Sequence, residues 1–231
     1  MPSSLFSQIS ALLFDLGGTL DGEGLHWLDR FYTLYEETGL SIPREHVKEA
    51  FFYADGLCYA DPGVNELGLR ALIKLHVKIQ MERLGIREAT VAEKLAHGFC
   101  ANMEGHFKRN LPVLLKLHRT YRLGVITNYY GNAEMILHEA GFGPILDVIL
   151  DSTRIGLSKP DQALFTMALS QLGVAAEHAV FVGDSYERDM VPAHAAGMKT
   201  IWIPGPCPRF TPEPGVVTTT INQLDELERF L

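Results

Sequence analysis

The chain has 231 residues, of which 47% are hydrophobic, and a formal net charge of −8 at pH 7. This length allows either one domain or one domain with a smaller insert. The acidic balance, without a basic cluster, disfavours nucleic acid as a partner, because that affinity comes largely from Lys and Arg neutralising phosphates. No apolar run approaches the roughly 20 residues of a membrane helix, and the N-terminus lacks a secretory pattern, so we expect a cytoplasmic protein with no membrane partner.

Apolar runs along the chain predict a series of buried strands. Most intervals between the later strands have the length and period of helices. Alternating strands and helices indicate the α/β fold class with a doubly wound parallel sheet. In such sheets, ligands bind at the carboxyl ends of the strands. The strands are expected at about residues 10–15, 122–127, 145–150, 179–183, 199–203 and 216–219.

The interval between the first two strands is too long for a simple crossover. Its first helical pattern carries apolar residues at three- and four-residue spacing, and similar patterns follow near 43–54, 65–84 and 88–104. Such stripes form the shared core of a helical bundle more often than a ligand surface. We therefore expect an all-helical cap domain over residues 22–105, inserted into a core domain of residues 1–21 and 106–231, with hinges near residues 21–24 and Gly105. The first stripe comprises Trp27, Leu28, Phe31, Leu34 and Tyr35.

Four short polar segments lie at the ends of predicted strands. Taken singly, they have simple structural interpretations: a tight turn, a helix N-cap, a surface lysine, and a cap followed by a first-turn acid. Their order along the chain and their common position at strand ends instead predict that their carboxylates, hydroxyl and lysine converge. The segments are FDLGGTLD at 14–21, VITN at 125–128, SKPD at 158–161 and VFVGDSYERD at 180–189.

In their order and residues, these segments resemble the motifs of the haloacid dehalogenase-like superfamily. Most members of that superfamily are Mg²⁺-dependent phosphatases that work through an aspartyl-phosphate. The resemblance covers roughly residues 9–204, and GDSYERDMVPAHAAGM at 183–198 is its most specific stretch. It implies a Rossmann-like core with a cap inserted after the first motif. It also implies a hydrolase that acts on a small phosphorylated substrate, as a monomer or homodimer.

The resemblance assigns catalytic and phosphate-binding roles. Asp15 matches the nucleophile, a carboxylate that attacks phosphorus and is then freed by water. Thr127 matches the hydroxyl that donates to a phosphate oxygen, and backbone amides in the same two motifs, at Gly18 and Asn128, add further donors. Lys159 matches the lysine that pairs with the phosphate and holds Asp15 ionised.

The resemblance also assigns a metal site for Mg²⁺, which prefers about six oxygen ligands. Asp15, the backbone carbonyl of Gly17, and Asp184 match its ligands. Asp189 matches a residue that braces the metal shell through water or hydrogen bonds.

Gly17 departs from the family pattern. The family's phosphatases usually carry an Asp there, which protonates the leaving oxygen and later activates water, and loss of such a group typically costs about 10²–10⁴ in rate. A working phosphatase could take its proton from Asp21, Glu23, His26 or another cap residue. It could also use a substrate whose leaving group is acidic enough to need no proton.

Two other interpretations of Gly17 stay open. The protein could be a non-catalytic or regulatory homologue that binds a phosphorylated ligand. It could instead catalyse a different hydrolysis, because haloacid dehalogenases and phosphonoacetaldehyde hydrolases also lack an acid at this position. Asp184 after Gly183 argues against the dehalogenase, since members of that class have a Ser-containing fourth motif instead.

Overall fold

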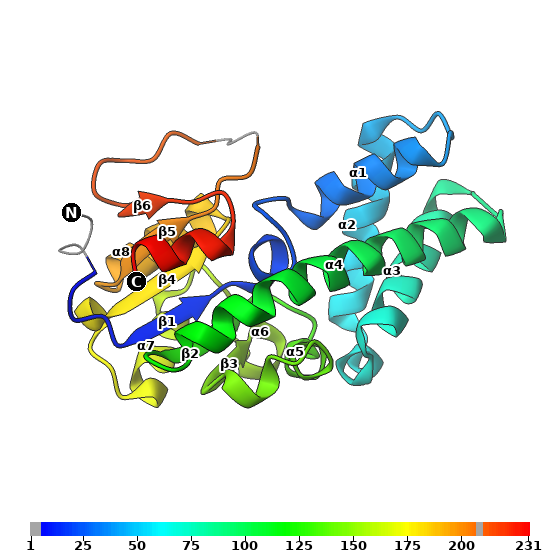
Figure 1. Cartoon of the computed structure of the whole chain (residues 1–231). Coiled ribbons are helices and arrows are strands. Elements are labelled where there is room, and N and C mark those ends of the chain that lie inside the picture. The colour runs from blue at the N-terminus through cyan, green and yellow to red at the C-terminus, as the bar shows by residue number, and fades with distance from the viewer. Residues whose placement is uncertain (1–5, 207–209) are drawn as a thin grey trace.

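The computed structural model describes residues 6–206 and 210–231. Its centre is a six-stranded sheet in the order β3-β2-β1-β4-β5-β6, in which each neighbouring pair is parallel (Figure 1). The predicted α/β class with a doubly wound parallel sheet is therefore confirmed. The strands are β1 (Ala11–Phe14), β2 (Arg122–Thr127), β3 (Val148–Asp151), β4 (Ala179–Gly183), β5 (Lys199–Trp202) and β6 (Thr219–Thr220).

Two strands differ from the predicted ranges. β3 starts later than expected because Gly143–Ile145 forms a helical turn that begins at a glycine and a proline. β6 is shorter and shifted because Gly215 adopts a φ of +88° and the Val216 N–H donates to Glu213 O, so a turn occupies the start of the predicted strand. Both shifts leave the strand order unchanged.

Helices cover both faces of the sheet. Leu12 and Phe14 of β1 pack on one side with α4 (Ala89–Leu117), α5 (Ala133–Glu139) and the C-terminal helical segment Leu224–Arg229. Leu13 points to the other side, which α7 (Gln162–Leu172) and α8 (Val191–Ala195) cover. Side chains alternate across a strand, and a parallel sheet is buried on both faces, which explains why all of β1 is apolar. A short helix, α6 (Ser152–Ile155), follows β3.

Residues between β1 and β2 form a helical layer beside the sheet, to the right in Figure 1. It contains α1 (Trp27–Glu37), α2 (Arg44–Ala60), α3 (Leu69–Leu84) and the first half of α4. The predicted stripe on α1 is buried here, with Leu34 only partly so, and Phe31 stacks on Phe99 of α4 with ring centroids 4.3 Å apart. The stripe thus forms mutual helical core, as its spacing predicts.

The second predicted hinge, at Gly105, does not coincide with a loop. Gly105 lies inside α4, whose 29 residues run without a break from the helical layer onto the sheet (Figure 1). The buried stripe continues past the glycine through Phe107, Val113 and Leu114. Tertiary packing of that stripe outweighs the roughly 1 kcal/mol that a glycine costs in a helix interior.

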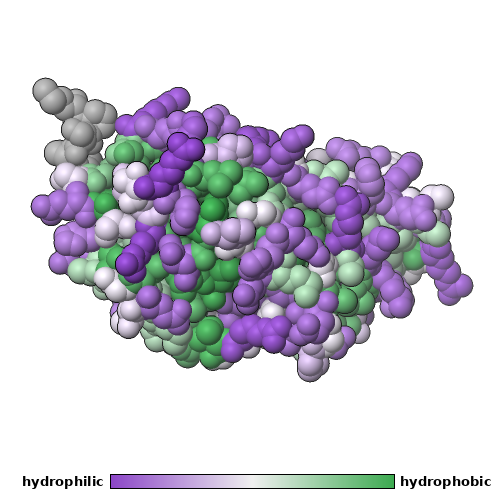
Figure 2. Space-filling view, turned by 60° about the horizontal axis from the view of Figure 1, so that its bottom comes forward, coloured by the Kyte–Doolittle hydropathy of each residue, from purple (hydrophilic) through white to green (hydrophobic). Residues whose placement is uncertain are grey.

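Hydrophilic side chains cover much of the surface in Figure 2, with hydrophobic ones between them. Isolated apolar side chains on a surface are normal. In the part of the chain that the structure describes, no helix is both long and apolar enough to cross a membrane.

Candidate active site

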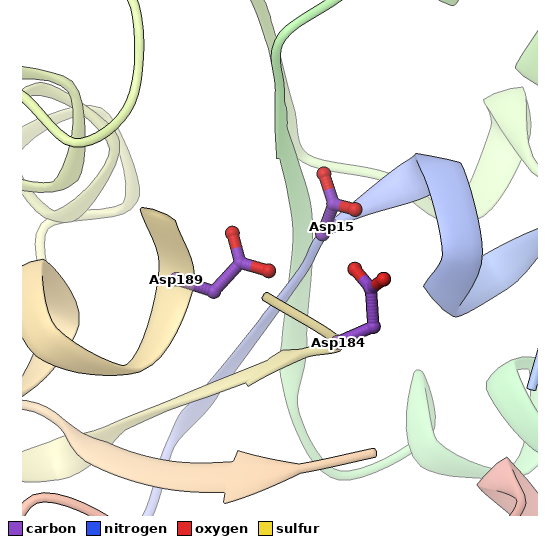
Figure 3. A group of neighbouring side chains, drawn as sticks. All are labelled: Asp15, Asp184 and Asp189. Atoms are coloured by element: carbon purple, nitrogen blue, oxygen red, sulfur yellow. The ribbon is translucent and has the colours of Figure 1, made fainter. Parts of the chain in front are cut away.

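The predicted site residues meet at the carboxyl ends of the central strands. Asp15 follows β1, Thr127 ends β2 and Asp184 follows β4, and these three strands are neighbours in the sheet. Asp189 comes from the helical turn after β4. One carboxylate oxygen from each of Asp15, Asp184 and Asp189 lies within 4.8 Å of the others, and Figure 3 shows the three groups around one space.

Lys159 joins two of these carboxylates. Its Nζ atom lies 2.6 Å from Oδ1 of Asp15 and 2.6 Å from Oδ1 of Asp189, and all three side chains are buried. The Asn128 side chain holds the lysine backbone, because its Oδ1 accepts from the Lys159 N–H (2.8 Å) and its Nδ2 donates to the Lys159 carbonyl (2.9 Å). The side-chain amide of Asn128 therefore positions Lys159. Only the backbone N–H of Asn128 is left to bind a phosphate.

The cluster carries more negative charge than one lysine balances. Burial raises the pKa of Asp15 to about 6, with Lys159 opposing the rise and Asp189 adding to it. Loss of bulk water also raises the pKa of Asp184 well above its ordinary value, and the negative charges of Asp15 and Asp189 add to the rise. Burial disfavours the Lys159 ammonium, but the two carboxylates outweigh it and raise its pKa. A divalent cation near Asp15 and Asp184 would relieve this repulsion.

Two glycines are sterically required beside the carboxylates, and Gly17 is not one of them. A Cβ on Gly18, whose φ is +86°, would lie 2.5 Å from Oδ2 of Asp184. A Cβ on Gly183 would lie 2.5 Å from Oδ2 of Asp189. Gly17 has an ordinary φ of −75° and ψ of 115°, so no backbone strain explains the glycine there.

Asp21, one of the three expected surrogate acids, is fully buried and does not line the cavity at the site. Its Oδ1 accepts from the Gly18 N–H (2.6 Å) and lies 3.2 Å from Arg30, and its Oδ2 accepts from the indole N–H of Trp27 (2.6 Å). The Gly18 N–H, expected to bind phosphate, is thus engaged by Asp21. The Asp21 carboxylate holds the loop after Asp15 against α1.

The other two expected acids differ in position. Glu23 pairs with Arg109 and lies outside the cavity. His26 lines the cavity together with Asp15 and Gly17. Its Nδ1 accepts from the Leu28 N–H (3.1 Å), which makes it the N-cap of α1. Nδ1 therefore carries no proton in this arrangement, and a protonated His26 would lose the cap.

The cavity has a volume of about 240 Å³ and lies between the strand ends and the helical layer. Its lining includes eight residues that the sequence analysis did not select: Phe51, Phe52, Asp55, Tyr59, Tyr129, Tyr130, Ser185 and Arg188. Asp55 could have been noticed, since it lies on one face of α2 between Phe51 and Tyr59, four residues from each. A larger hollow of about 690 Å³ between α3 and α4 contains none of the predicted site residues.

A family model described as haloacid dehalogenase-like hydrolase matches residues 65–203, more than half of the chain. The chain belongs to this family. The resemblance inferred from the four motifs is therefore confirmed, and the protein is a member of a hydrolase family.

Curated haloacid dehalogenase-like relatives match parts of the chain. A 155-residue stretch is 32% identical to pyrimidine 5'-nucleotidase YjjG of Escherichia coli and covers 65% of this chain and 67% of that protein. A 64-residue stretch is 41% identical to phosphoserine phosphatase of Thermus thermophilus and covers 28% of this chain and 26% of that protein. The chain thus spans between about a quarter and two thirds of the length of these two relatives.

Solved structures share the fold. The structure of the putative HAD-hydrolase YfnB from Bacillus subtilis has a TM-score of 0.57 and 18% identity, with 96% of this chain and 98% of that chain covered. At this identity the likeness concerns the fold alone.

Proposed function

We propose that the protein is a Mg²⁺-dependent phosphatase that hydrolyses a small phosphorylated metabolite through an aspartyl-phosphate on Asp15. The observation that best supports this proposal is the buried cluster in which Lys159 bridges Asp15 and Asp189 beside Asp184. Phosphoryl transfer depends mainly on charge neutralisation and positioning, which such a cluster supplies. The names of the two relatives, a nucleotidase and a phosphatase, are consistent with this activity.

The donor set fits a magnesium ion. Asp15, Asp184 and the carbonyl of Gly17 would hold it, because Mg²⁺ prefers oxygen ligands and keeps several waters. Asp189 would position the site, since its Oδ1 accepts from Lys159 and its Oδ2 accepts from the Ser185 N–H (2.9 Å). When bound, the cation would supply positive charge against the phosphoryl oxygens.

In the proposed reaction, a carboxylate oxygen of Asp15 attacks phosphorus, and the bond from phosphorus to the leaving oxygen breaks with its electron pair on that oxygen. Lys159 and the Thr127 hydroxyl stabilise the charge on the non-bridging oxygens. Water then attacks the phosphorus of the aspartyl-phosphate, which releases phosphate and restores Asp15. Gly17 cannot donate a proton to the leaving oxygen. The rate of the first step should therefore depend on the basicity of the leaving oxygen.

We also propose that residues 22–105 act as a cap that covers the site. The connection between α2 and α3 contacts the core, because the Asn132 side chain donates to Leu67 O (2.7 Å) and the Leu69 N–H donates to Glu139 (3.1 Å). A cap held over the site in this way would exclude water while phosphate is transferred.

The experiment that tests this function is a panel of phosphomonoesters assayed with the purified protein in Mg²⁺ and in EDTA. We expect turnover that requires Mg²⁺ and is abolished in Asp15→Asn. Turnover retained in Asp15→Asn would contradict the covalent mechanism. Metal-dependent ligand binding without turnover would favour the non-catalytic homologue, and halide release from a haloacid without metal would favour the dehalogenase.

A further inference from the structure

The cavity that holds the carboxylates also has an aromatic wall. The rings come from α1, from α2 and from the loop that follows β2, so three separate segments converge on one space. Aromatic rings give a flat apolar surface that stacks on other planar groups. The wall consists of Trp27, Phe51, Phe52, Tyr59, Tyr129 and Tyr130.

Two rings of this aromatic wall are poorly covered by protein. Phe52 is 50% exposed and Tyr59 is 40% exposed, although both line the cavity. Tyr59 also packs against Tyr130, with ring centroids 4.6 Å apart and an angle of 56°. Large apolar side chains gathered at the mouth of a cavity are typical of a ligand-binding surface, whereas scattered ones need no explanation.

Asp55 provides a polar group within the aromatic wall. The hydroxyl of Tyr130 donates to its Oδ1, and this is the one hydrogen bond to the Asp55 side chain within residues 6–206 and 210–231. An ionised carboxylate has about four acceptor sites, so Asp55 keeps acceptor capacity toward the cavity. Burial raises its pKa, while the Tyr130 hydrogen bond and the positive charge of Arg188 act in the opposite direction and favour the carboxylate.

From this placement and the proposed function, on which this inference rests, we propose that the substrate is an aryl phosphate whose ring bears a hydrogen-bond donor. The ring would lie against the aromatic wall, and Asp55 would accept from the donor at its far edge. Gly17 fits this leaving group. When the bond from phosphorus to the aryl oxygen breaks, the electron pair stays on an oxygen whose charge the ring delocalises, so no proton from position 17 is needed.

The donor requirement is tested with two substrates of similar size and leaving-group basicity, 4-(hydroxymethyl)phenyl phosphate and 4-ethylphenyl phosphate. A hydrogen bond to a charged group corresponds to roughly 10-fold or more in affinity. We expect wild type to favour the hydroxymethyl compound by about 10-fold in kcat/KM. Asp55→Ala should bring the ratio close to one. The matched control is Glu49→Ala, which removes an exposed carboxylate of the same helix and should keep the wild-type ratio.

The aromatic requirement is tested with phenyl phosphates and fluoroalkyl phosphates of matched leaving-group acidity. Phe52→Ala should lower kcat/KM for the aryl series by about 10-fold, the usual scale of one stacking contact, and leave the fluoroalkyl series unchanged. Tyr53→Ala is the control, because Tyr53 is 49% exposed and lies outside the cavity. Thermal unfolding of each variant verifies that the fold is retained.

The results separate failure of this inference from failure of the proposed function. Equal rates for both pairs in wild type, or an unchanged ratio in Asp55→Ala, would overturn the aryl donor assignment while phosphatase activity stands. If no phosphomonoester is hydrolysed, the proposed function fails, and the same two para-substituted compounds are compared by calorimetric binding in Mg²⁺. A preference that depends on Asp55 would then support the pocket assignment, and its absence would overturn it.

Discussion

Gly17 faces Trp27 across space that a side chain could occupy. A Cβ built on Gly17 has the Nε1 atom of Trp27 as its nearest neighbour, at 4.0 Å, and Gly17 has an ordinary φ of −75°. The positive φ in this loop belongs to the next residue, Gly18, at +86°. The missing acid at position 17 is therefore a matter of chemistry, not of backbone geometry.

The first prediction is that Gly17→Asp folds and gains activity on alkyl phosphates. A restored acid near the leaving oxygen should raise their kcat/KM by about 10²-fold, on the usual scale of acid catalysis. Aryl phosphates should gain much less, because their leaving oxygens need less protonation. Steady-state assays on a matched alkyl and aryl pair measure both effects.

Gly18→Asp serves as the control for Gly17→Asp. Its new side chain would collide with Asp184 at a positive φ, so turnover should be lost for both substrate classes. Equal gains for alkyl and aryl phosphates in Gly17→Asp would contradict the role assigned to this position.

A second prediction concerns metal binding and stability. Mg²⁺ should raise the Tm of wild type, because a ligand that binds the folded state stabilises it. Burial first, and neighbouring carboxylates second, raise the pKa values of Asp15 and Asp184, so ionising both groups without a cation is unfavourable. Asp184→Asn should already be more stable in EDTA and should lose most of the Mg²⁺ shift. Scanning calorimetry in EDTA and across a Mg²⁺ titration measures this.

Glu187→Gln is the matched control for the metal prediction. It removes the same charge three residues away, on an exposed side chain outside the carboxylate cluster. Its Mg²⁺ shift should equal that of wild type. A full shift in Asp184→Asn would remove Asp184 from the set of ligands.

The core of the fold and of the site followed from local sequence. Apolar runs placed β2 and β4 at their observed residues, and polar residues directly after such runs placed Asp15 and Asp184 at neighbouring strand ends. This worked because parallel strands end at one edge of the sheet, so position along the chain translates into position in space.

The aromatic wall and the partners of Asp21 could not be predicted in the same way. Tyr130 and Asp55 are 75 residues apart and meet only because the helical layer packs on the core in one orientation. Helical periodicity predicts which face of α2 is apolar, but not which neighbour that face meets. Asp21 was a reasonable acid by sequence proximity, yet the Trp27 indole and the Gly18 N–H occupy both of its oxygens.

A third prediction concerns the contact between cap and core. Glu139→Ala should speed hydrogen exchange at the Leu69 amide and its neighbours by about 5-fold, because that N–H loses its acceptor and the local opening free energy falls by about 1 kcal/mol. Exchange in β1 should not change. Glu134→Ala, an exposed change on the same helix, is the control. Unaltered exchange near Leu69 would show that this contact does not hold the cap.

The first predicted hinge is a less suitable place to test cap motion. Gly24 has a φ of +75°, which proline cannot adopt, and its N–H donates to Gly18 O (2.8 Å). A proline there would disturb the loop after Asp15 together with any hinge.

The last prediction concerns His76, which is buried in the helical layer and stacks on Phe31 with ring centroids 5.6 Å apart. The amide nitrogen of Gln80 lies 2.8 Å from its Nδ1, and burial lowers the pKa of His76 to about 3. In the unfolded chain, His76 therefore binds a proton as the pH falls through about 6.5, whereas in the folded chain it stays neutral at that pH. The contribution of neutral His76 to the free energy of unfolding should be fully present above about pH 6.5. It should fall by about 1.4 kcal/mol per pH unit as the pH drops toward 3.

Urea unfolding of wild type and His76→Gln at pH 7 and pH 5 isolates the His76 contribution, because other titrating groups affect both proteins. His76→Gln should be less stable than wild type at pH 7, since it loses the stacked ring. Between pH 7 and pH 5, wild type should lose about 2 kcal/mol more than the variant. His97→Gln, which changes an exposed histidine of α4, should follow wild type. Parallel losses in wild type and His76→Gln would mean that His76 accepts its proton without unfolding the helical layer.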